Sequence, residues 1–225
     1  MAPNLAETSV LYGQCRERVV ELTTGLSDDD AATPVPACPG WTVHDLVAHL
    51  CGVADDALND RMEGAPSPAW TARQVDARRD KSVTDILDEW TGLAATFETL
   101  PLPYQAVADV ACHEQDLRGA LHVPGFRDSE AMEFLVPVLL DRLADRVATH
   151  GLAPLEIVCG PNGVVAGAGN EGELVTWRIT PFEMFRATFG RRSPDQVLAT
   201  GWEGDGTPYL EHIFVFGPTE HDLQE

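Results

Sequence analysis

The chain has 225 residues, of which 36 are acidic and 15 are Lys or Arg, so its formal net charge is −21 at pH 7. With 44% apolar and 23% charged residues, it has the composition of a folded protein, long enough for one large domain or two small ones. The negative charge excludes nucleic acid and anionic membranes as expected partners, because both bind proteins through Lys and Arg.

The cysteines and the start of the chain both point to the cytoplasm. The chain has no apolar run near the roughly 18–20 residues of a membrane-spanning helix, and Met1–Leu11 lacks the charged and apolar regions of a secretory signal. The five cysteines are odd in number, widely scattered and without a C-x-x-C pair; they are Cys15, Cys38, Cys51, Cys112 and Cys159. We therefore expect reduced thiols in a cytoplasmic protein.

The first 150 residues show the three-to-four residue apolar spacing that is typical of amphipathic helices. The second predicted helix begins at Thr42, with Asp45 three residues later as a capping-box partner. The fifth begins at Asp128 or Ser129 and carries Pro137 as an expected kink. The predicted helices cover about residues 5–26, 42–54, 82–97, 104–121 and 128–147, with a short helical stretch over 70–79. Long helices joined by short loops predict an up-down bundle.

The pattern changes after Gly151-Leu152-Ala153-Pro154. β-Branched and apolar runs predict strands at 155–159, 163–166 and 174–179, and short helices are expected at 181–189 and 195–200. The predicted fold class is therefore α+β: a four-helix bundle over residues 1–150, followed by a small α+β domain over residues 151–225.

A glycine-rich segment, Gly167-Ala168-Gly169-Asn170-Glu171-Gly172, matches the G-x-G-x-x-G pattern of dinucleotide-binding proteins. That pattern requires a following helix within a βαβ unit, whereas a β-rich segment follows here and only about fifty residues remain. We therefore interpret the segment as a hairpin loop rather than a nucleotide site.

Three side chains on two predicted helices form a candidate metal site. His49 lies on or beside the apolar face of the second helix, and Asp109 and His113, four residues apart, project from one face of the fourth. Two imidazoles and one carboxylate on rigid helices would hold a divalent cation and leave coordination positions open. The competing interpretation makes His49 a hydrogen-bonded core residue and the other two a surface pair. His44 lies about 140° around the helix from His49 and is not expected to join them.

Two segments resemble the mycothiol-dependent maleylpyruvate isomerase family, part of the DinB-like metal-binding four-helix-bundle superfamily. The first is Cys38–Leu50, with the sequence CPGWTVHDLVAHL, and the second is Asp109–Leu121, with the sequence DVACHEQDLRGAL. The C-terminal run Phe182–Ser193, followed by Gly217-Pro218, is similar to the small C-terminal domain of the family.

This resemblance implies a divalent metal, usually zinc, held at His49, Asp109 and His113, and mycothiol, a low-molecular-weight thiol of actinobacteria, as cosubstrate. The thiolate would add to an activated cis alkene, the former double bond would rotate, and elimination would release the trans product. In the alternative S-transfer reaction, the thiol stays attached to a small-molecule electrophile. We expect such an enzyme to be a monomer or homodimer.

One departure concerns Asp109: the family pattern has an acidic residue at this place, and the best-known member has Glu where this chain has Asp. The side chain is one methylene shorter, so it could ligate directly, act through a water or accompany a changed activity. Two other functions stay open: a non-catalytic metal-binding or ligand-binding module, and an enzyme of secondary metabolism that uses the metal site without mycothiol.

Four further residues have candidate roles. Asp116, one turn after His113, could support that histidine, although a solvated carboxylate is the simpler interpretation. Arg191 and Arg192 are candidate catalytic residues that could bind a substrate carboxylate, although such arginines are more often surface or interdomain residues. Trp41 is expected to pin the junction of its loop with the second helix.

Overall fold

The computed structural model describes residues 5–225, which form two compact units. The first extends to Gly125 and includes Glu225, and the second comprises Phe126–Gln224. The stretch Met1–Leu11, predicted to carry no secretory signal, lies partly outside the described residues. Among residues 5–225, no helix is both long and apolar enough to cross a membrane.

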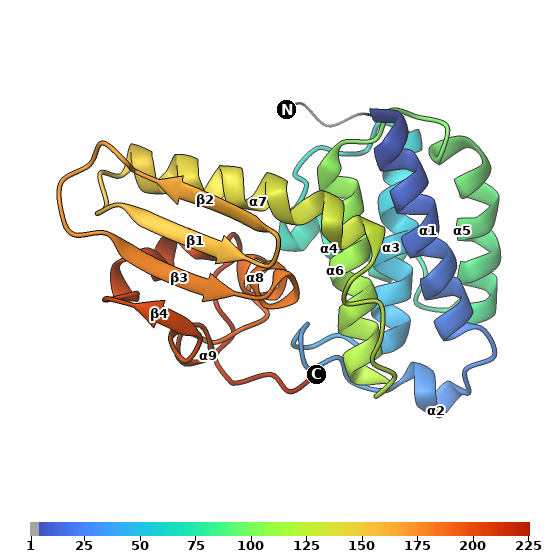
Figure 1. The fold of residues 1–225 in the computed structure, drawn as a ribbon. Coiled ribbons are helices and arrows are strands. Elements are labelled where there is room, and N and C mark those ends of the chain that lie inside the picture. The colour runs from blue at the N-terminus through green and yellow to red at the C-terminus, as the bar shows by residue number, and fades with distance from the viewer. Residues whose placement is uncertain (1–4) are drawn as a thin grey trace. The chain divides into compact units, whose positions relative to one another are not determined.

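The first unit is a four-helix bundle (Figure 1). Its long helices contact one another in a closed ring, in which α1 touches α6 and α5, and α3 touches α5 and α6. These four helices are α1 (Leu5–Thr23), α3 (Val43–Leu58), α5 (Val83–Phe97) and α6 (Tyr104–Ala120). Two short helices, α2 (Asp28–Ala31) and α4 (Pro68–Asp76), complete the unit, and α4 packs on α3.

The local sequence determines where the bundle helices begin and which faces they bury. Thr42 and Asp45 form the predicted capping box of α3, in which each side chain accepts a hydrogen bond from the backbone N–H of the other. Ser82 and Asp85 do the same for α5. The apolar faces of both helices are buried in the bundle, through Val43, Leu46, Val47, Leu50 and Ala54 of α3 and Ile86, Leu87, Trp90, Ala94 and Phe97 of α5.

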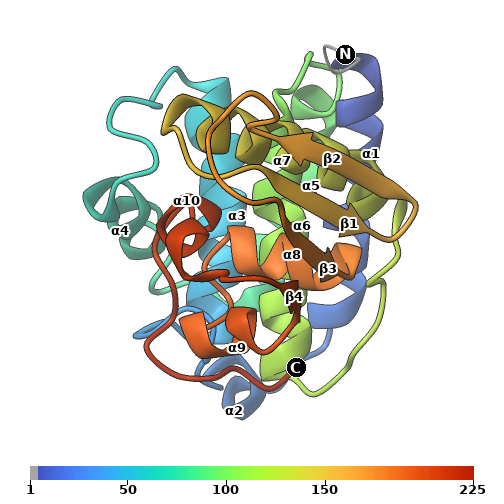
Figure 2. The same ribbon diagram turned by 60° about the vertical axis from the view of Figure 1, so that its left-hand side comes forward.

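The second unit is built on a four-stranded sheet with the order β2-β1-β3-β4 (Figure 2). Strand β1 pairs antiparallel with β2 and parallel with β3, and β4 pairs antiparallel with β3. The strands are β1 (Leu155–Cys159), β2 (Asn162–Ala166), β3 (Val175–Ile179) and β4 (Gly201–Glu203). The other elements are α7 (Glu130–Thr149), α8 (Pro181–Thr188), α9 (Pro194–Leu198), the 3-10 turn η1 (Thr207–Tyr209) and α10 (Leu210–Ile213). The α+β fold class is therefore confirmed.

Helix α7 lies in the second unit. The domain boundary predicted from the sequence, near residues 150–154, placed this helix in the first. The helix packs along β2 and against β1, α8 and α10, so its apolar face completes the core of the sheet unit. The units consequently divide between Gly125 and Phe126. Sequence periodicity identifies such a helix but not the surface on which it packs.

The glycine-rich segment connects β2 to β3 and is not the hairpin loop that the sequence predicted. Because β1 lies between these two strands, the segment crosses from the edge of the sheet to its interior. Asn170 anchors it by donating from Nδ2 to the carbonyl of Leu152 at 2.7 Å. A strand follows, as expected, so the segment lacks the helix that a dinucleotide site requires.

Candidate metal centre

The three predicted ligands His49, Asp109 and His113 lie together in the bundle. One carboxylate oxygen, Oδ1 of Asp109, is 3.7 Å from Nε2 of His49 and 3.6 Å from Nε2 of His113. Their candidate ligand atoms all lie within 4.8 Å of one another. The side chains of His49 and His113 are 4% and 12% exposed and that of Asp109 is 33% exposed, so the carboxylate is the most exposed member of the cluster.

These separations fit a divalent cation better than direct contacts among the side chains. A hydrogen bond would need the nitrogen and oxygen atoms about 2.7–3.2 Å apart, so 3.6–3.7 Å is too long. Ligands about 2.0–2.1 Å from a tetrahedral zinc ion lie roughly 3.3–3.5 Å from one another. The donor set, two imidazole nitrogens and one carboxylate oxygen, is also one that zinc accepts.

Each imidazole is held from its far side, so that Nε2 faces the cluster. Nδ1 of His49 lies 2.7 Å from Oε1 of Gln74, and Nδ1 of His113 lies 2.9 Å from Oδ2 of Asp116. Histidines that bind metals characteristically donate their other N–H to such an oxygen, which orients the ring and selects the tautomer. Asp116 is 1% exposed, so the interpretation of this residue as a solvated carboxylate was wrong.

The segment before α3 brings an aromatic ring against both histidines. Trp41 N–H donates to the carbonyl of Cys38, and Gly40 has a φ of +87°, as a type II turn with Pro39 and Gly40 at its centre requires. The Trp41 ring lies 5.1 Å from that of His49 and 6.4 Å from that of His113, measured between ring centroids. The turn thus fixes the loop–helix junction and also supplies one wall of the site.

The same turn places a thiol beside the cluster. Sγ of Cys38 lies 3.3 Å from Oδ2 of Asp116 and 3.9 Å from Nδ1 of His113. These three side chains form a second group that could hold a metal ion. It uses the nitrogen of His113 that already contacts Asp116, so a cation there would displace that hydrogen bond, whereas the first group leaves it intact.

Arg191 and Arg192 lie in the second unit, and both make contacts within it. Arg191 donates to the carbonyl of Phe189 at 2.7 Å. Arg192 is buried, and its guanidinium donates to both oxygens of Glu183 at 2.6 and 2.9 Å. Their predicted part in catalysis stays a prediction.

Sequence reasoning overlooked Gln74 and Trp70 as neighbours of the site. The Trp70 ring lies 6.1 Å from that of His49, nearly perpendicular to it, as measured between ring centroids. Trp70 and Gln74 both belong to α4, a segment in which only a short helical stretch was expected. The available clue was Gly52, one turn after His49: a Cβ there would lie 2.5 Å from Cβ of Gln74. A glycine inside a helix marks such close packing.

Alkylation should distinguish Cys38 from the other cysteines. Burial raises the pKa of Cys15 and Cys51 to about 12 and that of Cys159 to about 11, and Cys112 is buried too. Because the thiolate is the reactive form, we expect iodoacetamide at pH 8 to modify one thiol per native chain, at Cys38. Peptide mass spectrometry checks the position, and the unfolded chain, in which all five should react, is the control. Rapid labelling of a buried thiol would contradict this expectation.

A four-helix bundle that carries a His–Asp–His cluster, followed by a small α+β unit, is the class of protein that these observations define. Residues 12–101 match the sequence model of the mycothiol maleylpyruvate isomerase N-terminal domain, so the resemblance to that family is confirmed.

Solved structures show the same fold. A mutant of the mycothiol-dependent maleylpyruvate isomerase is 15% identical, with a TM-score of 0.57 over 87% of this chain and 92% of that one. Another structure of the mycothiol-dependent maleylpyruvate isomerase is 14% identical, with a TM-score of 0.53 over 84% and 90% of the two chains. No curated protein matches the sequence.

Proposed function

We propose that the protein is a divalent-metal-dependent enzyme that uses mycothiol as a thiolate nucleophile on an electrophilic small molecule, by cis–trans isomerisation or S-transfer. The observation that carries the proposal is the single carboxylate oxygen that faces two imidazole Nε2 atoms. We propose mycothiol as the thiol because residues 12–101 match the mycothiol maleylpyruvate isomerase N-terminal domain. The donor set of two imidazole nitrogens and one carboxylate oxygen supports zinc as the cation.

His49, Asp109 and His113 would hold the cation. When bound, a zinc ion supplies Lewis acidity that lowers the pKa of a thiol, so that thiolate is available at neutral pH. Because Oδ1 of Asp109 faces both nitrogens, the proposal makes it a direct ligand despite its shorter side chain. Gln74 and Asp116 hold the two rings in place, which avoids the cost of reorienting them during the reaction.

The isomerisation is balanced without any redox partner. The thiolate forms a C–S bond to the alkene, and the π electrons move toward the activating carbonyl. Rotation about the resulting single bond and elimination then restore the alkene as the trans isomer and release the thiolate. The Trp41 ring beside both histidines provides an apolar wall that would exclude water on one side.

The test is turnover with purified, zinc-loaded protein and mycothiol on a panel of electrophiles that includes cis-enoyl acids. We expect thiol-dependent turnover that His49→Ala abolishes. His44→Ala is the matched control, because His44 lies on the same helix but contacts the carbonyl of Lys81. Zinc binding without turnover of any substrate would favour the binding module, and thiol-independent turnover would favour an enzyme that has dispensed with mycothiol.

A further inference from the structure

The amide of Gln74 lies between His49 and a carboxylate that belongs to neither metal group. Gln74 is on α4 and is 3% exposed. Its Oε1 is 2.7 Å from Nδ1 of His49, and its Nε2 is 2.9 Å from Oδ2 of Asp56 on α3. The amide therefore spans two partners, one at each end.

Asp56 determines which way round this amide lies. Its other oxygen, Oδ1, accepts from Nε of Arg61 at 2.8 Å, so the carboxylate pairs with a guanidinium. An ionised carboxylate can only accept hydrogen bonds, so the NH₂ group of Gln74 must face it. The carbonyl oxygen then faces His49, and an oxygen can only accept there.

The proton of neutral His49 consequently lies on Nδ1. The lone pair is left on Nε2, the nitrogen that faces Asp109 and His113. Gln74 selects this tautomer of His49 through a neutral amide, whereas the hydrogen-bond partner of His113 is the carboxylate of Asp116.

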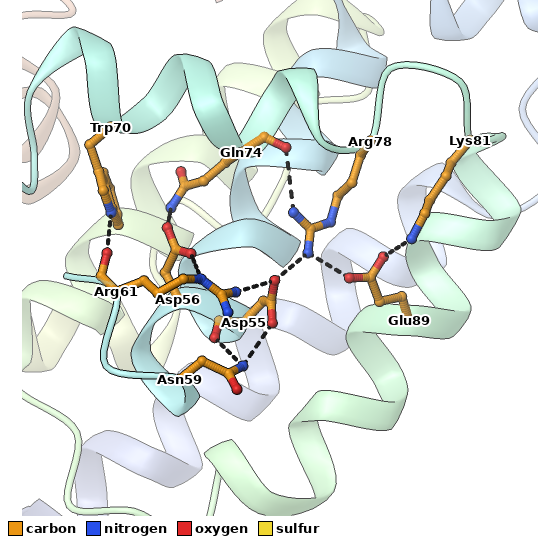
Figure 3. Close-up of polar contacts among 9 residues, drawn as sticks. All are labelled: Asp55, Asp56, Asn59, Arg61, Trp70, Gln74, Arg78, Lys81 and Glu89. Atoms are coloured by element: carbon orange, nitrogen blue, oxygen red, sulfur yellow. Dashed lines mark hydrogen bonds and ion pairs between the residues drawn. The ribbon is translucent and has the colours of Figure 1, made fainter.

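A chain of ion pairs fixes the position of the amide (Figure 3). Arg61 also contacts Asp55 at 2.6 Å, and Arg78 contacts Asp55, Glu89 and the backbone carbonyl of Gln74. Arg78 is buried, and these contacts tie α4 to α3 and α5. The missing Cβ of Gly52 allows the stem of Gln74 to lie directly on α3.

We propose that Gln74 is a positioning residue that holds His49 as the Nδ1–H tautomer and so presents Nε2 as a cation ligand. The tautomer follows from the hydrogen bonds alone. Its effect on cation affinity rests on the proposed function.

The test compares the wild type with Gln74→Met, which keeps the unbranched stem beside Gly52 but removes the amide. In the metal-free protein near pH 8, ¹⁵N–¹H correlation spectra of the imidazoles report which nitrogen of His49 carries the proton. We expect Nδ1–H in the wild type and loss of that preference in the variant. Affinity for Zn²⁺, measured with a competing chelator, should fall about 10–100-fold, as is usual when such a partner of a metal-binding histidine is removed.

Gln115→Met is the matched control. Gln115 is also buried in the first unit, but its amide donates to the backbone carbonyl of Gly125. The control should keep both the His49 tautomer and the Zn²⁺ affinity of the wild type. If Gln74→Met does not fold, Asp56→Asn replaces it: an asparagine can also donate, so the Gln74 amide can turn over and His49 should show mixed tautomers.

Three results would overturn the assignment: a proton on Nε2 of wild-type His49, an unchanged tautomer in the folded variant, or a Gln74→Met protein that binds Zn²⁺ as tightly as the control. A different combination of results would support the assignment and contradict the proposed function. In it, His49 is Nδ1–H in the wild type and not in Gln74→Met, but the wild type has no thiol-dependent activity. The two failures are therefore distinguishable.

Discussion

Asp109→Ala and His113→Ala should each lower the affinity for Zn²⁺ by about 100-fold or more. Each variant removes one of three ligands, and the two that remain cannot define a tight site. Competition with a chelator measures the dissociation constant for Zn²⁺, and the zinc content of the purified proteins is a second measurement. His44→Ala should resemble the wild type in both measurements.

Thermal unfolding of the metal-free variants separates ligand loss from misfolding. The side chain of Asp109 is one-third exposed and meets the two imidazoles at distances beyond hydrogen-bond range. A cooperative unfolding transition in each metal-free variant would show that it folds, and Zn²⁺ should raise the unfolding temperature of the wild type and of His44→Ala more than that of Asp109→Ala or His113→Ala. Full zinc occupancy in both variants would exclude these residues as ligands.

Glu114→Ala should destabilise the first unit by about 3–5 kcal/mol, the usual cost of removing one partner from a buried ion pair. Glu114 is 1% exposed and accepts from Nε and Nη2 of Arg18 at 2.9 and 2.8 Å and from Nε of Arg118 at 3.0 Å. The variant would leave both guanidiniums without the carboxylate that they share across α1 and α6.

Urea denaturation followed by circular dichroism measures this loss. Asp76→Ala is the control, because Asp76 and Arg79 form an ion pair in which both side chains are more than half exposed, and such pairs contribute little. A Glu114→Ala protein as stable as Asp76→Ala would show that the buried pair does not hold α1 to α6.

The clustering of His49, Asp109 and His113 could be predicted from the sequence because it depends on helical periodicity and on the family resemblance. Asp109 and His113 share a face by their four-residue spacing, and Thr42 with Asp45 fixes where the helix of His49 begins. The strand Leu155–Cys159 also has the predicted bounds, because a β-branched run between turn residues is a strong local signal.

The residues that contact this cluster could not be predicted, because burial and pairing are properties of the tertiary structure. Whether Asp116 is solvated or buried depends on the turn before α3, which is distant in sequence. That turn places Sγ of Cys38 against the Asp116 carboxylate. Gln74 becomes important only because α4 packs on Gly52. The assignment of α7 to the second unit likewise depends on which surface its apolar face meets.

Zinc K-edge X-ray absorption spectroscopy of the zinc-loaded protein tests the central claim most directly. The account predicts two imidazole nitrogens and a carboxylate oxygen at about 2.0–2.2 Å without sulfur, and a new Zn–S distance of about 2.3 Å after mycothiol is added. Sulfur scattering before any thiol is added, removed by Cys38→Ser, would place the metal in the Cys38–His113–Asp116 group and contradict the account.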